Sequence, residues 1–119
     1  MKRALGLLLL LLLSAVNPLQ AHAFLKHATP DVGGRMARSP NEVKILFTEV
    51  IEPAFSKIQV FAESGKEVDK GDVHRDSSNH ALLKVSLPPL DPGTYKVVWR
   101  VVSIDTHVTS GSYTFRVGG

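Results

Sequence analysis

The sequence contains no cysteine among its 119 residues. No disulfide can restrain the unfolded chain, so buried apolar surface must hold a domain of this size together. The same absence excludes thiolate as a nucleophile and as a metal ligand. Any metal site must therefore be built from histidine, carboxylate, methionine or backbone groups.

Long apolar runs are also absent, except near the N-terminus. There Lys2 and Arg3 precede the apolar residues 4–16, and Pro18 lies in the polar segment that follows. The run is shorter than the roughly 20 residues that a membrane-spanning helix needs. It is typical of a secretory signal peptide, so we expect residues 1–21 to be removed and residues 22–119 to form one exported domain without membrane insertion.

Two cleavage positions compete in this segment. Cleavage after Ala21 leaves His22 at the new N-terminus, whereas the small-x-small triplet 21–23 would leave Phe24 there. Loss of residues 1–21 leaves 12 basic and 11 acidic residues in 98, although the whole chain has a formal net charge of +3. An almost neutral domain gives no electrostatic support for nucleic-acid binding.

Hydrophobic residues alternate with polar ones at a period of two, which is typical of half-buried β-strands. Strands are predicted at 43–47, 57–61, 82–87, 94–102 and 112–117, with Trp99 on the buried side. Pro, Gly, Asn and Ser supply the breaks between them, including Ser110-Gly111, and no amphipathic helix is found. The charged stretch 62–81 is interpreted as an exposed hairpin or long loop. The pattern predicts an all-β, immunoglobulin-like β-sandwich.

Asp105 and His107 follow the strongest predicted strand and would face the same side if it continued. Such a D-x-H pair is half of a metal site, or only a hydrogen-bonded turn. A terminal His22 would add both its amine and its imidazole to one ion. Glu49 ends another strand and is either a further oxygen donor or an exposed carboxylate. Nitrogen donors with a carboxylate oxygen favour Cu(II) among the divalent metals.

The sequence offers no signature of an enzyme. It contains no nucleophile and base constellation, no Gly-rich phosphate loop and no paired carboxylates at a spacing suited to hydrolysis. We therefore expect no enzymatic activity.

Several segments together carry a resemblance to a known family. They are HAFL at 22–25, ATP at 28–30, ILFTE at 45–49, GTYKVVWRVVSIDTH at 93–107 and GSYTF at 111–115. The chain resembles the CopC family of periplasmic copper-binding, copper-resistance proteins. The resemblance implies an immunoglobulin-like barrel or sandwich, cleavage before His22, and one Cu(II) held by His22, Asp105, His107 and, as a further ligand, Glu49.

The resemblance also implies a periplasmic copper carrier or buffer, which passes copper to a separate inner-membrane transporter. We expect the protein to be a monomer. Some members hold a second, Cu(I) site in a Met-rich loop, but here only Met1 and Met36 occur, so one Cu(II) site is expected. His74 and His80 are interpreted as solvated loop histidines. Two alternatives remain at this stage. One is a copper oxidase with an N-terminal histidine, like lytic polysaccharide monooxygenases. The other is a purely structural immunoglobulin-like domain.

Overall fold

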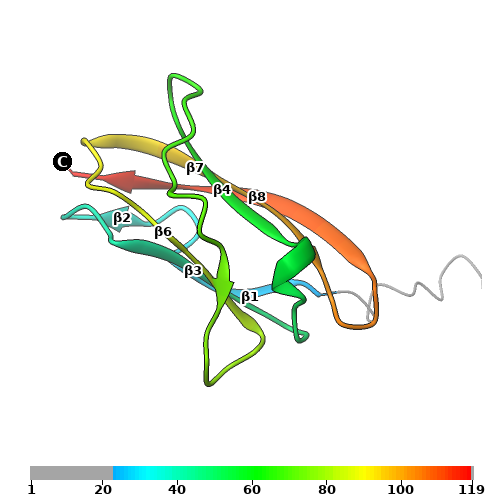
Figure 1. Ribbon diagram of the computed structural model, residues 1–119. Coiled ribbons are helices and arrows are strands. Elements are labelled where there is room, and N and C mark those ends of the chain that lie inside the picture. The colour runs from blue at the N-terminus through cyan, green and yellow to red at the C-terminus, as the bar shows by residue number, and fades with distance from the viewer. Residues whose placement is uncertain (1–22, 119) are drawn as a thin grey trace, which may run out of the picture.

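The computed structural model describes residues 23–118, which form two four-stranded sheets in two layers (Figure 1). The predicted signal peptide and His22 lie outside the described residues. The first sheet has the strand order β1-β3-β6-β5 and the second β2-β8-β7-β4. Every pair of neighbouring strands is antiparallel except β2 and β8. The strands are β1 (Leu25–Thr29), β2 (Arg35–Met36), β3 (Glu42–Phe47), β4 (Lys57–Ala62), β5 (His74–Arg75), β6 (Leu82–Ser86), β7 (Gly93–Val102) and β8 (Val108–Val117), with one short 3-10 helix, η2 (Pro53–Phe55).

Alternate residues of the long strands point into the space between the sheets. In β7, Tyr95, Val97 and Val101 are buried, whereas Lys96 and Arg100 are exposed. Burying one such aliphatic side chain stabilises the fold by about 1.5–3 kcal/mol, which is how the domain folds without a disulfide. The largest fully buried side chains come from both sheets and from two connecting loops: Phe47, Phe115, Ile45, Ile51, Ile58, Leu83, Val43, Val60, Val85, Val97, Val101 and Pro30. The predicted immunoglobulin-like β-sandwich is confirmed.

All five strands predicted from the period of two are present, but the last one is longer than expected. The break predicted at Ser110-Gly111 is wrong, because β8 runs through both residues and pairs with β7 along its whole length. Gly111 lies opposite Trp99, and a Cβ atom there would be 2.3 Å from Cζ2 of the indole. Glycine is required at this position by the packing of the tryptophan and not by a turn.

The stretch 62–81 is mostly irregular, as predicted, but its carboxylates fix it to the sheets. Asp69 Oδ1 accepts a hydrogen bond of 2.8 Å from the backbone N–H of Val60. Asp72 Oδ1 accepts one of 2.7 Å from the N–H of Ser86. The two residues of β5 pair with β6 within this stretch, so the segment is anchored at several points.

None of the helices within residues 23–118 is long and apolar enough to cross a membrane.

Candidate metal centre

Asp105 and His107 lie in the turn that joins β7 to β8, at one end of the sandwich. The two strands pair up to Val102 and Val108, and residues 103–107 form the turn. Thr106 has a φ of 71°, in the left-handed region that a continuing strand does not use. The expectation that the strand would continue through Asp105 and His107 is therefore wrong.

The turn nevertheless brings the two side chains together. Nδ1 of His107 lies 3.1 Å from Oδ2 of Asp105, and the Ser103 hydroxyl donates a hydrogen bond to Oδ1 of the same carboxylate. The Ser103 hydroxyl and, secondarily, the His107 imidazole hold the pKa of the Asp105 carboxyl below its usual value. The side chains of His107 and Asp105 are 45% and 52% exposed. They form an open pair, ionised on the carboxylate, that an ion can reach from solvent.

The N-terminal segment lies beside this turn. Thr109 Oγ1 donates a hydrogen bond of 2.6 Å to the carbonyl oxygen of Ala23, a residue that is 1% exposed. On the other side, the N–H of Phe24 donates to Thr48 Oγ1 at 2.9 Å, and the N–H of Thr48 donates to the carbonyl of Phe24 at 2.9 Å. The blue start of the described chain and the orange β7–β8 turn lie at the same end of the molecule (Figure 1).

Glu49 lies at the same end but does not complete a site. Glu49 is half-buried and lies between Thr48 and Val50 in the chain. The carbonyl oxygen of Val50 accepts a 3.1 Å hydrogen bond from the N–H of Ile104. Its backbone neighbours thus contact both the N-terminal segment and the turn. Among residues 23–118, however, no three His, Cys, Asp or Glu side chains form a group that could hold a metal ion. Within these residues Asp105 and His107 remain a pair, and the third predicted ligand, His22, lies outside the described residues.

Two hydroxyls near the turn were not singled out from the sequence. Ser103 is 1% exposed, although it lies between the more exposed Val102 and Ile104. Its hydroxyl fixes Asp105, whereas that of Thr109 fixes Ala23. Ser103 continues the alternation of buried residues in β7 and lies two residues before Asp105. A serine in that position is a sequence signal that could have identified it. The role of Thr109 depends on a contact 86 residues away in the chain, which no local pattern shows.

The other described histidines do not join this pair in a group of three potential metal ligands within residues 23–118. His27 is exposed on β1, His80 is exposed in the turn before β6, and His74 on β5 contacts the carbonyl of Asp72 through Nδ1 at 2.7 Å.

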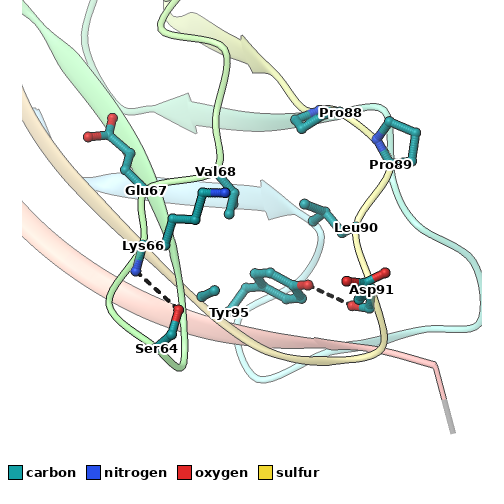
Figure 2. Close-up of a pocket in the computed structure, with 10 residues that line it drawn as sticks. Ser64, Lys66, Glu67, Val68, Pro88, Pro89, Leu90, Asp91 and Tyr95 are labelled. Atoms are coloured by element: carbon teal, nitrogen blue, oxygen red, sulfur yellow. Dashed lines mark hydrogen bonds between the residues drawn. The ribbon is translucent and has the colours of Figure 1, made fainter.

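A hollow of about 400 Å³ lies near the opposite end of β7. Figure 2 shows Lys66 and Glu67 on one side of it and Leu90 and Tyr95 on the other, with the Tyr95 hydroxyl donating to the carbonyl of Asp91 at 2.6 Å. Tyr95 is the third residue of β7, whereas the D-x-H turn follows its last residue. No predicted ligand lines the hollow.

Comparisons with known proteins establish the family and agree with the fold. A family model described as the CopC domain matches residues 25–118. The chain belongs to the CopC family. Protein YobA of Escherichia coli (strain K12) is 35% identical over 112 residues, covering 92% of this chain and 90% of that protein. Copper resistance protein C of Pseudomonas syringae pv. tomato is 36% identical over 104 residues, covering 82% of each. The crystal structure of CopC from Methylosinus trichosporium OB3b matches with a TM-score of 0.77 at 36% identity, over 82% of this chain and 94% of that one.

Proposed function

We propose that the protein is a periplasmic copper carrier or buffer in copper resistance or homeostasis, which binds one Cu(II) at the end of the sandwich that bears Asp105 and His107. Members of the CopC family are copper-binding carriers and not enzymes, in agreement with the expected lack of enzymatic activity. The observation that supports this site best is the Asp105–His107 pair beside Ala23, the residue that follows His22.

The position of Ala23 beside the turn supports His22 as a ligand, because the two residues are consecutive in the chain. Consecutive Cα atoms lie about 3.8 Å apart, and the Ala23 carbonyl is bound to Thr109, two residues beyond His107. A free His22 amine and its imidazole would supply two nitrogens to one ion. We propose His107 as the third nitrogen ligand and Asp105 as the oxygen ligand. Nδ1 of His107 and Oδ2 of Asp105 face each other at 3.1 Å, so Nδ1 is the ring nitrogen that can share an ion with this carboxylate and the one that we assign to copper.

The donor set favours Cu(II). Imidazole, amine and carboxylate suit Cu(II), which also stands highest in the divalent affinity order. Glu49 is our candidate for an additional oxygen donor. Met36, the one methionine among the described residues, pairs with Val117 at the opposite end of β8, about 30 Å from the turn by strand geometry. We therefore propose a single Cu(II) site and no Met-rich Cu(I) site.

The proposal requires export and processing. Removal of residues 1–21 as a signal peptide would free the His22 amine, whereas cleavage before Phe24 would delete the residue altogether. The mature chain, residues 22–119, would then act as a monomer in the periplasm and pass copper to a separate inner-membrane transporter.

The test is the intact mass of the exported protein with and without one equivalent of Cu(II), followed by electron paramagnetic resonance of the loaded form. A chain that begins at His22, binds one copper and gives a nitrogen-rich signal is expected. A chain that begins at Phe24, or one that binds no copper above background, would overturn the proposal.

Three variants separate the ligands. His107→Ala should lose copper affinity, whereas His74→Ala, which removes an imidazole on β5, should not. A chain that keeps Ala21 ahead of His22 retains the imidazole but places the amine elsewhere, so its affinity should also fall. Imidazoles and amines must lose their protons to bind metal. The affinity for Cu(II) should therefore fall as the pH is lowered from neutral to mildly acidic. Equal affinity for all chains, or a flat pH profile, would contradict this ligand set.

A further inference from the structure

The second sheet has an unusual distribution of charge. Its four strands, β2, β4, β7 and β8, contain no aspartate or glutamate. They contain five basic residues, which we call the basic face: Arg35, Lys57, Lys96, Arg100 and Arg116. In the whole sequence, by contrast, acidic residues are nearly as numerous as basic ones, 11 against 14.

All five side chains project from the outward side of this sheet. Lys96 and Arg100 alternate with the buried residues of β7, and Arg116 alternates with those of β8. Register places Lys57 directly opposite Arg100, and Arg35 opposite Arg116. All five residues are exposed.

Like charges in directly opposed positions destabilise a sheet. Two carboxylates offset this repulsion at one edge only: Glu67 interacts with Lys57, and Glu63, which accepts a 3.1 Å hydrogen bond from the N–H of Thr94, lies beside Lys96. The ion pairs found within residues 23–118 are Lys84–Asp76 and the D-x-H pair, neither of which involves the basic face. Glu67 lies at the β4 edge, where it accepts a 3.3 Å hydrogen bond from Gln59 Nε2. An anionic surface would relieve this repulsion along the whole sheet.

The end of the basic face nearest the D-x-H turn is apolar. Val102 and Val108 pair on the outward side, and Val108 is 46% exposed. Ile104, in the turn itself, is 62% exposed, and Phe55 of η2 is 68% exposed. The N–H of Glu52, the residue just before η2, donates a hydrogen bond to the carbonyl oxygen of Val102. This bond holds η2, and with it Phe55, near the apolar end of the basic face. Basic residues beside exposed apolar ones are the combination that binds proteins to the surface of anionic bilayers.

We propose that the basic face docks the protein on an anionic phospholipid membrane, with its apolar end against the headgroups. The side chains of β8 between the cations are small, namely Ser110, Ser112 and Thr114, so the face is flat and suits a lipid surface better than a shaped protein partner. Docking would place the D-x-H turn close to the membrane. This inference goes beyond the proposed copper function and does not depend on it.

The experiment is co-sedimentation of the exported protein, without added metal, with phosphatidylglycerol/phosphatidylcholine vesicles and with phosphatidylcholine vesicles. Each Lys or Arg near an anionic bilayer strengthens partitioning by about fivefold. The triple variant Lys96→Gln/Arg100→Gln/Arg116→Gln should therefore bind on the order of 100-fold more weakly. Binding should also fall steeply with salt.

The matched control is Lys26→Gln/Lys66→Gln/Lys70→Gln, which removes the same charge from exposed positions outside the basic face. It should keep most of the binding, and circular dichroism should show that both triple variants are folded. An equal loss in the two variants would overturn the proposal, because net charge alone would then explain binding. Absence of binding to phosphatidylglycerol vesicles would also overturn it. Binding to polyglutamate without binding to vesicles would also overturn the proposal and would indicate an acidic protein partner instead.

Discussion

Replacing Gly111 by alanine should destabilise the domain through Trp99. The new Cβ would lie 2.3 Å from Cζ2, 2.6 Å from Cη2 and 3.0 Å from Cε2 of the indole, whereas ordinary contacts begin at 3.4 Å. The ring would have to move by about 1 Å or rotate away. Phe47 and Tyr113 oppose such a movement, because their ring centroids lie 6.2 Å and 6.4 Å from that of Trp99.

Two effects set the size of the change. Inserting a methyl group into a packed site costs about 1–3 kcal/mol. Alanine also restricts the unfolded chain, which returns about 0.4–1 kcal/mol. The net loss of unfolding free energy should be about 1–2 kcal/mol, and each kcal/mol lowers Tm by about 4–8 °C in a domain of this size. Urea denaturation gives the free energy, and near-ultraviolet circular dichroism reports the indole environment.

The control is Ser112→Ala, one residue further along β8 on the exposed side, which should change stability by less than about 0.5 kcal/mol. In a double-mutant cycle, Trp99→Leu should make Gly111→Ala less costly, with a coupling of about 0.5–3 kcal/mol. If Gly111→Ala proved as stable as the parent, or if no coupling were measured, the proposed contact would be refuted.

Three further predictions concern polar groups. Burial raises the pKa of Tyr113, and no partner for its hydroxyl is found within residues 23–118, so Tyr113→Phe should raise the unfolding free energy by about 1 kcal/mol in urea titration; a loss of stability would contradict this. Thr109→Val removes the hydroxyl that holds the N-terminal segment and should cost about 1 kcal/mol and weaken Cu(II) binding in a competition titration; unchanged affinity would contradict its positioning role. The Ser78 hydroxyl and the Lys84 ammonium lower the pKa of Asp76, so its ionised form stabilises the fold above the ordinary aspartate pKa of about 3.9. That contribution is lost as the pH falls below this value, and Asp76→Asn should flatten the acid limb of stability against pH; an unchanged slope would contradict it.

The strands could be predicted wherever a long segment buries one face, because alternation then leaves a clear mark in the sequence. The ten residues of β7 show this best. Three strands were not predicted. β2 and β5 have only two residues each, too few to display a period, and β1 buries only one of its five residues, so it shows no alternation. Gly111 was read as a break because glycine usually marks turns. Its true role depends on an indole across the sheet, which the local sequence does not reveal.

The candidate site was predictable in its residue types but not in its geometry. The D-x-H spacing identified Asp105 and His107, and the structure brings them to 3.1 Å. They meet through a tight turn and not through a strand continuation. The buried Ser103 holds Asp105 from two residues away, so its position beside the D-x-H pair could have identified it. The hydroxyl of Thr109 acts on Ala23, 86 residues away in the chain, and such a tertiary contact leaves no spacing rule that could be recognised beforehand.

The proposed site joins two segments that are far apart in the sequence, which links copper binding to stability. Its ligands would come from the N-terminal segment and from a turn more than 80 residues later, and this chain has no disulfide to hold those parts together. A ligand that binds only the folded state stabilises it by about 2.7 kcal/mol at 100 times its dissociation constant. Cu(II) should therefore raise Tm, and the rise should vanish in His107→Ala but persist in His74→Ala. A rise of the same size in both variants would place copper elsewhere and remove the physical basis for a site at this end of the sandwich.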